Sequence, residues 1–170
     1  MIVLIDTNIW IYLYVAGLTW VIRGIVQSLG HEVWITDAVR RELDDPKHGG
    51  ATARTDGMFA DGTVVIAKVH VHDQGMSDDY KKAEDEIIAL INQSPAKGSR
   101  RFITNDTQAL KKCLRYGIKT FDLKDFLVWI HRKGLAEHGD VVSGFDRVVE
   151  DGTVFEVTRK QFIDELAKSG

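Results

Sequence analysis

Short apolar runs alternate with amphipathic segments up to about residue 121. The runs at 2–5, 32–35, 64–71, 101–104 and 118–121 predict strands, and the segments at 8–15, 20–29, 37–43, 77–92 and 107–116 predict helices. The first run, Ile-Val-Leu-Ile, has no polar position, which is typical of a strand buried on both faces. Strands that alternate with helices predict an α/β fold with a central parallel sheet and helices on both faces.

The pattern changes after residue 121. Residues 122–133, 140–150 and 158–167 predict three helices without further strands, and the last is opened by the capping box Thr158-x-x-Gln161. We therefore expect residues 1–121 to form the main domain and residues 122–170 to form a helical extension packed on it. Residues 45–62 are rich in Gly, Thr, Asp and Lys, which predicts a surface loop.

Composition and charge indicate the cellular compartment of the protein and the way in which it could bind nucleic acid. The 170 residues include one cysteine, Cys113, so no intramolecular disulfide can form, and this favours a reducing, cytoplasmic compartment. Asp6 interrupts the apolar start without a preceding basic segment, which argues against a signal peptide. No run of about 18 apolar residues predicts a membrane span. With a net charge of -3, any binding to nucleic acid must be local or bridged by a cation.

Three carboxylates fall at the ends of predicted strands or on inward faces of predicted helices. Asp6 follows the first strand, Asp106 follows the fourth, and Glu42 lies on the helix after the second. Ligands of α/β proteins bind beyond the carboxyl ends of parallel strands, so these side chains are candidates for one site. Each also has a simpler interpretation. Asp6 and Asp106 could cap the helices that follow them, and Glu42 could be a solvated helix residue beside Arg40 and Arg41.

The helix at 77–92 offers a fourth acid from the consecutive residues Glu84, Asp85 and Glu86. At about 100° per residue, Glu84 shares a face with the apolar Ile87 and Ile88, Asp85 points away from that face, and Glu86 lies at its edge. A carboxylate on a buried face is costly unless it is paired or binds a cation. Glu84 is therefore the first choice for the site, with Asp85 as the fallback and Glu86 as a third alternative.

Several carboxylates at one sheet edge repel one another and need protons or cations to coexist. Ligand sets made only of oxygen suit Mg²⁺ or Mn²⁺, whereas zinc prefers nitrogen and sulfur. One or two such ions can activate a water for in-line cleavage of a phosphodiester bond. The acids therefore favour a metal site that works on phosphate esters.

The ordered motifs resemble the PIN domain family. The matching segments are Ile5-Asp6-Thr7-Asn8, Ile35-Thr36-Asp37-Ala38-Val39-x-x-Glu42-Leu43, Glu84 before Ile87-Ile88-Ala89-Leu90, and Ile103-Thr104-Asn105-Asp106. The resemblance covers residues 2 to about 121 and implies a three-layer α/β/α sandwich with a central parallel sheet. It also implies a Mg²⁺- or Mn²⁺-dependent endoribonuclease. Its catalytic and metal-binding acids would be Asp6, Glu42, Glu84 and Asp106, with Asn8 as a hydrogen-bonding support.

Further residues follow from the same hypothesis. The Thr104 hydroxyl is a second support, because it lies beside the strand end and can position Asp106 or a water. The basic residues around the Asp106 strand are either ordinary solvated surface or, as a group, a rim that holds an RNA backbone; they are Lys97, Arg100, Arg101, Lys111, Lys112 and Arg115. The resemblance implies an RNA substrate and, for the toxin of a toxin–antitoxin pair, an antitoxin partner. A second copy of the chain is a further candidate partner.

Other classes of function fit the sequence less well. Phosphatases of the haloacid dehalogenase type need a second Asp two residues after the first, where this chain has Asn8. Receiver domains need adjacent acids at the first strand end and a Lys after the last strand, where this chain has Asp122. The remaining alternative is a non-catalytic RNA-binding or protein-interaction domain with the same fold, which predicts no dependence on metal.

Overall fold

The computed structural model describes residues 1–46, 51–68, 83–92, 99–152 and 156–168. Within these ranges, the side chains of residues 51–55, 83–85, 92, 156 and 157 are not described.

Five parallel strands form one sheet in the order β3-β2-β1-β4-β5. Their bounds are β1 Ile2–Ile5, β2 Glu32–Thr36, β3 Val64–Ala67, β4 Arg100–Ile103 and β5 Thr120–Phe121. The apolar strand β1 is central, where Leu4 pairs with Trp34 on one side and Phe102 on the other. Leu4 and Ile5 are fully buried, as expected of a strand covered on both faces. The predicted α/β fold with a parallel sheet is confirmed.

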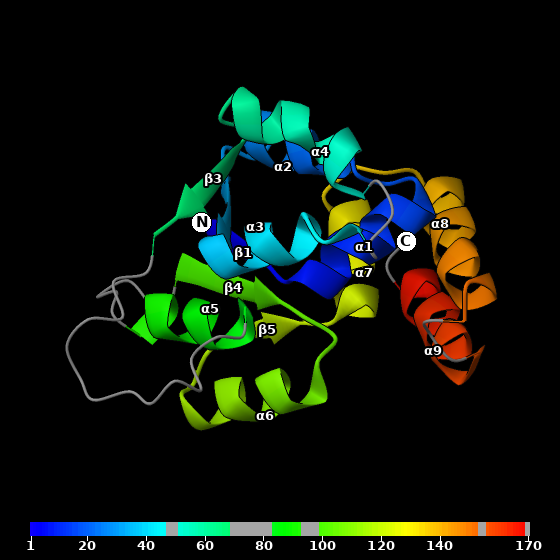
Figure 1. Ribbon diagram of the computed structural model, residues 1–170. Helices are drawn as coiled ribbons and strands as arrows, with labels where there is room; N and C mark the ends of the chain where they lie inside the picture. Colours follow the sequence, from blue (N-terminus) through cyan, green and yellow to red (C-terminus); the bar gives the residue numbers. More distant parts are fainter. Residues whose placement is uncertain (47–50, 69–82, 93–98, 153–155, 169–170) are drawn as a thin grey trace.

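Helices surround this sheet, as Figure 1 shows. Their bounds are α1 Thr7–Ala16, α2 Val21–Gln27, α3 Asp37–Leu43, α4 Ala51–Ala60, α5 Ala83–Asn92, α6 Thr107–Arg115, α7 Leu123–Arg132, α8 His138–Glu150 and α9 Glu156–Ala167. Helices α2, α3 and α5 pack against β2, and α7 packs against β5. The arrangement is compatible with a three-layer sandwich.

The strand order reverses direction between β1 and β4. From β1 the chain proceeds outward to β2 and β3, then returns to place β4 on the other side of β1. Ile5 pairs with Ile103 across this point, and the Asp6 N–H donates to the Ile103 carbonyl at 3.1 Å. Such a reversal leaves a crevice at the carboxyl ends of the two strands, where α/β proteins bind ligands. The residues that follow β1 and β4 are therefore close in space.

Of the C-terminal helices, α8 packs against α1, and α7 and α9 pack against α8 and against each other (Figure 1). Phe145 of α8 and Phe162 of α9 are fully buried, with ring centres 4.4 Å apart. Helix α8 packs closely on the end of α1. Gly144 of α8 permits this contact, because it has no side chain to meet Leu18, which follows α1. Residues of α7, α8 and α9 belong to the same hydrophobic cluster as the strands.

The predicted surface loop at 45–62 is wrong, because α4 occupies Ala51–Ala60. Met58 is buried in the core cluster, and the Phe59 ring lies 6.0 Å from that of Trp10. The Arg40 guanidinium sits 4.5 Å from the centre of the Phe59 ring. These tertiary contacts favour a helix in a segment whose Gly and Asp content alone indicates a loop.

Two boundary predictions also change. The capping box at Thr158 is wrong, because α9 begins at Glu156 and Thr158 lies inside its first turn. The strand predicted at 64–71 ends at Ala67 within the described residues, and the helix predicted at 77–92 is described from Ala83 onward. Residues 69–71 of the first and 77–82 of the second lie outside the described residues.

In the described part of the chain, no single helix has both the length and the apolar character to cross a membrane. Helices α1 and α2 satisfy the requirement only when they are taken together, and the pair is bent by 112° at its break. Both helices contribute fully buried side chains to the hydrophobic core.

Candidate functional site

Asp6 is a buried carboxylate at the junction of β1 and α1. Its side chain is only 4% exposed. One oxygen, Oδ1, accepts the Thr7 N–H at 2.8 Å, and the other, Oδ2, accepts the Thr104 hydroxyl at 2.7 Å. The cap that the sequence offered as the simpler interpretation is therefore formed. The hydrogen bonds and the positive end of the α1 dipole stabilise its charge in the core.

Thr104 links Asp6 to Asp106. Its hydroxyl, fully buried, donates to Asp6 and accepts the Asp106 backbone N–H at 3.0 Å. Asp106 Oδ1 in turn accepts the Ala109 N–H at 2.7 Å and caps α6. The support of a catalytic site by Thr104 remains a prediction. Two helices, α1 and α6, thus begin at one edge of the sheet, each with an aspartate at its N-cap.

Glu42 joins the same group through Thr7. The Thr7 hydroxyl donates to Glu42 Oε2, while the Thr7 backbone N–H donates to Asp6. Glu42 is partly buried. The basic neighbours on α3 have other partners, since Arg40 pairs with Asp44 and Asp56. Glu42 is therefore partly exposed and also hydrogen-bonded to α1 through Thr7.

Tyr12 and Asn105 stand next to this hydrogen-bonded chain. The pKa of the Tyr12 phenol is raised above 10.0, first by burial and then by the negative charge of Asp6, while a hydrogen bond with Asn105 lowers it. Asn105 Oδ1 also accepts the Leu123 N–H of α7 at 2.8 Å. Sequence reasoning gave these two residues no role at the site. For Asn105, the sequence signal that could have indicated a role was its position between Thr104 and Asp106.

The fourth acid is resolved only in part. Glu86 is 9% exposed, accepts the Ala38 N–H of α3 at 3.1 Å and pairs with Arg41 at 3.3 Å. Its oxygens thus bind the first turn of α3, which gives it a structural role. The side chains of Glu84 and Asp85 lie outside the described part of α5. Glu84 remains the predicted fourth acid by helical phase, with Asp85 as the fallback.

Asn8 is exposed on the first turn of α1. It takes no part in the hydrogen bonds that connect Asp6, Thr7 and Thr104. Its supporting role therefore remains a prediction. The neighbouring residue Thr7 is the one that donates hydrogen bonds to Asp6 and Glu42.

The donor chemistry of the site suits a hard cation. Asp6, Glu42 and Asp106 offer carboxylate oxygens, the ligand type that Mg²⁺ and Mn²⁺ prefer. Among the described residues, no three Asp, Glu, His or Cys side chains are gathered closely enough to enclose an ion. The four-acid set, which needs the side chain of Glu84, remains a prediction.

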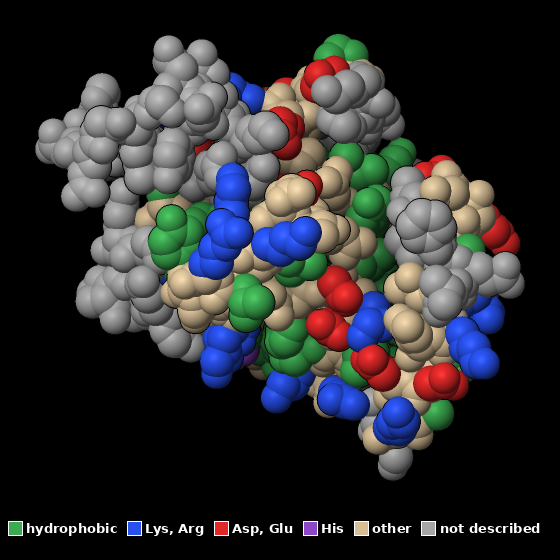
Figure 2. All heavy atoms as spheres, turned by 90° about the horizontal axis from the view of Figure 1, so that it is seen from below, with side chains coloured by type: hydrophobic (Ala, Val, Ile, Leu, Met, Phe, Trp, Pro, Cys, Tyr) green, Lys and Arg blue, Asp and Glu red, His purple; other side chains and the backbone are tan. Residues whose placement is uncertain are grey.

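The predicted basic rim is smaller than the sequence indicated. Arg100 is buried, donates to the Leu90 carbonyl at 2.8 Å and lies 5.6 Å from the Trp34 ring centre, so it is a structural residue. Arg101 donates to the Arg100 carbonyl. Lys97 lies outside the described residues. Exposed Lys111 and Arg115 on α6 remain, with Lys112 partly exposed, and Figure 2 shows Lys and Arg side chains on the face formed by that helix.

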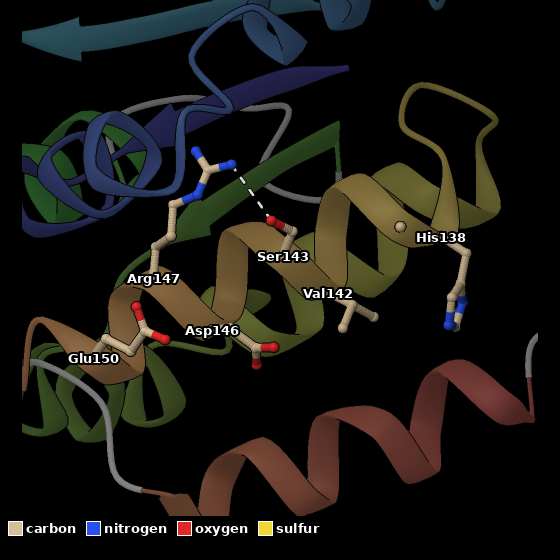
Figure 3. Close-up of a pocket in the computed structure, with 7 residues that line it drawn as sticks. His138, Val142, Ser143, Asp146, Arg147 and Glu150 are labelled. Atoms are coloured by element: carbon tan, nitrogen blue, oxygen red, sulfur yellow. Dashed lines mark hydrogen bonds between the residues drawn. The ribbon is translucent and has the colours of Figure 1, made fainter.

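A separate open hollow of about 520 Å³ lies along α8 (Figure 3). Two of its charged side chains, Arg147 and Asp146, join α8 to other helices. Arg147 reaches toward α1 and donates to the Ala16 carbonyl at 3.2 Å and to Ser143 at 3.4 Å. Asp146 points toward α9, where it pairs with Arg159. The hollow is therefore an interhelical surface, and the sheet edge is the better candidate site.

No protein-family model matches the chain, and no curated protein matches it.

Proposed function

We propose that this chain is a Mg²⁺- or Mn²⁺-dependent endoribonuclease of the PIN type that hydrolyses RNA phosphodiester bonds at the β1–β4 edge. The observation that carries the proposal is the hydrogen-bonded chain from Glu42 through Thr7, Asp6 and Thr104 to the backbone of Asp106. Three acids from separate parts of the sequence lie along this row of hydrogen bonds, at the point where the strand order reverses. Two of them also cap helices, and a cap alone does not account for the buried connection between them.

Asp6, Glu42 and Asp106, with Glu84 as the fourth acid, would hold the cation. When bound, such an ion supplies Lewis-acid activation of water and neutralises charge on the phosphodiester. The residues of the chain orient the acids: Thr104 fixes Asp6, and Thr7 fixes Glu42. The N-terminal ends of α1 and α6 lie at the same edge, and their dipoles favour the phosphate anion there.

Asp6→Asn tests the proposal, because asparagine keeps the helix cap and the shape of the side chain but loses the charge. We expect Mn²⁺-dependent cleavage of a fluorophore–quencher single-stranded RNA to fall by more than about 100-fold, since even residues that support metal ligands cost about 10–100-fold. Asp164→Asn, at an exposed position on α9, is the matched control and should cleave like the wild type. Equal activity of Asp6→Asn and the control would disprove the site.

The same assay ranks the three consecutive acids. Glu84→Gln should lose cleavage while keeping its stability. Glu86→Gln should mainly lower the melting temperature, because Glu86 binds the first turn of α3 and Arg41. RNA binding with no Mn²⁺-dependent cleavage by the wild type would instead support the non-catalytic alternative. A toxin role would further require a protein partner that inhibits the cleavage.

A further inference from the structure

Helix α6 leads away from the candidate site with one side buried and the other exposed. Ala109 and Cys113 are fully buried on the core side. The exposed positions on the other side are Thr107, Gln108, Lys111, Leu114 and Arg115. Since they recur at three- and four-residue spacing, they form one stripe along the helix. The stripe begins at the residue after Asp106, so it is continuous with the candidate site.

The stripe and the turn after it are positively charged. Residues 107–121 contain the basic Lys111, Lys112, Arg115 and Lys119 and no acidic residue, in a chain whose net charge is -3. Lys111, Arg115 and Lys119 are exposed. Figure 2 shows Lys and Arg side chains with hydrophobic ones among them over this face. A local positive region on an acidic protein is a binding surface for a polyanion.

Two large hydrophobic side chains are exposed among these cations. Leu114 is 81% exposed and Tyr116 is 54% exposed. Within the described residues the other exposed large hydrophobics are Trp20, Val65 and Ile66, so two of the five lie at the end of this helix. Exposed aromatic rings between basic side chains are the arrangement that binds single-stranded nucleic acid, because bases stack on the ring while the cations contact phosphates.

We propose that the surface formed by Lys111, Leu114, Arg115, Tyr116 and Lys119, here named the α6 surface, binds a single-stranded RNA segment that leads along α6 to the bond at the candidate site. This inference rests on the proposed function, since it supplies the path by which RNA reaches Asp6 and Asp106. Lys111 and Arg115 contact successive phosphates, and Tyr116 stacks on a base.

The chemistry of the α6 surface favours a single strand over a duplex. A ring can stack only on a base that is already unstacked, and a double-stranded RNA module spans about 16 base pairs. A helix of nine residues extends only about 14 Å. An acidic protein would satisfy the cations but would give Tyr116 no base to stack on, so it serves as the competing outcome in the test.

The test measures binding of a fluorescein-labelled oligouridylate by anisotropy in EDTA. Lys111→Ala combined with Arg115→Ala should weaken binding about 10-fold and lower the slope of log affinity against log salt by about 1.4, because each phosphate contact on a single strand contributes about 0.7. Tyr116→Ala should weaken binding by about 5-fold or more while leaving the salt slope unchanged. Tyr116→Phe keeps the ring and should bind like the wild type.

Lys133→Ala combined with Lys168→Ala is the matched control, because it removes two exposed cations elsewhere. It should leave the affinity within about 2-fold, consistent with loss of long-range attraction alone. Three results would overturn the proposal: equal weakening by the control pair, no weakening by the α6 variants, or displacement of the RNA by polyglutamate at equal charge. Tighter binding of a duplex of the same length would overturn the single-strand assignment.

Binding in EDTA is independent of cleavage, so this experiment and the cleavage assay can fail separately. If the wild type binds RNA at the α6 surface but does not cleave it, the nuclease proposal is rejected and the proposed RNA-binding surface is kept. If the wild type cleaves RNA and the α6 variants bind RNA as well as the wild type does, the nuclease proposal is kept and the α6 surface is rejected.

Discussion

Thr104 makes two contacts that hold the candidate site together. Its buried hydroxyl donates to the Asp6 carboxylate and accepts the Asp106 N–H. A single side chain therefore fixes the position of one acid and the backbone of another. The hydrogen bond to Asp6 involves a charged acceptor, and such bonds are stronger than neutral ones.

Thr104→Val should therefore destabilise the protein, because valine has nearly the same shape but leaves a buried carboxylate oxygen and a backbone N–H without this partner. We expect a loss of about 1–3 kcal/mol in the free energy of unfolding, measured in urea. Thr104→Ser keeps the hydroxyl and should retain most of that stability. A valine variant as stable as the wild type would show that the two contacts contribute little.

At the scale of elements, α7 begins at a capping residue with an unusual environment. Asp122 Oδ1 accepts the Asp125 N–H at 2.7 Å. Burial raises the pKa of Asp122 above its ordinary value of 3.8, the charges of Asp125 and Glu165 add to the rise, and the Asp125 N–H and Lys124 oppose it. The folded protein thus binds this proton more tightly than the unfolded chain. The resulting stability is present below the ordinary pKa and is lost as the pH rises through the raised pKa.

Asp122→Asn should remove this dependence, because the amide still caps the helix and carries no charge. The melting temperature of the variant minus that of the wild type should be more positive near pH 7 than near pH 4, because the wild-type carboxyl is ionised in its buried position at pH 7. Asp122→Ala loses the cap as well and should be about 1 kcal/mol less stable than Asp122→Asn at both pH values. A difference between the asparagine variant and the wild type that does not change with pH would contradict the raised pKa.

At the scale of the whole molecule, one hydrophobic cluster includes the strands, α1 and the three C-terminal helices. The contact between α8 and α1 depends on Gly144, where an added Cβ would lie 2.7 Å from Leu18 Cδ1 and 3.2 Å from Ala16 Cβ. Both neighbours are buried, so they have little room to move. A shared core of this kind predicts that the whole chain unfolds in one cooperative step.

Gly144→Ala tests that expectation. It should destabilise the whole protein by about 1–3 kcal/mol, because the crowded α1–α8 contact must shift. Tryptophan fluorescence and far-ultraviolet circular dichroism should report the same lowered midpoint. Gly139→Ala in the same helix meets nothing within 4 Å and should be neutral or slightly stabilising, since alanine favours helices over glycine. Two separate transitions would show that α8 unfolds apart from the sheet.

The sequence by itself determined the parallel α/β framework, because uninterrupted apolar strands such as Ile2–Ile5 and amphipathic helices such as Thr107–Arg115 encode their own burial. It also indicated Asp6 and Asp106, since each follows a strand, and Glu42, since it lies on the helix after a strand. Only the tertiary structure decided which hydroxyls connect them, because the Thr7–Glu42 and Thr104–Asp6 contacts join residues 35 and 98 positions apart. The helix α4 and the buried role of Arg100 likewise depend on packing partners, Trp10 and Trp34, that local pattern does not contain.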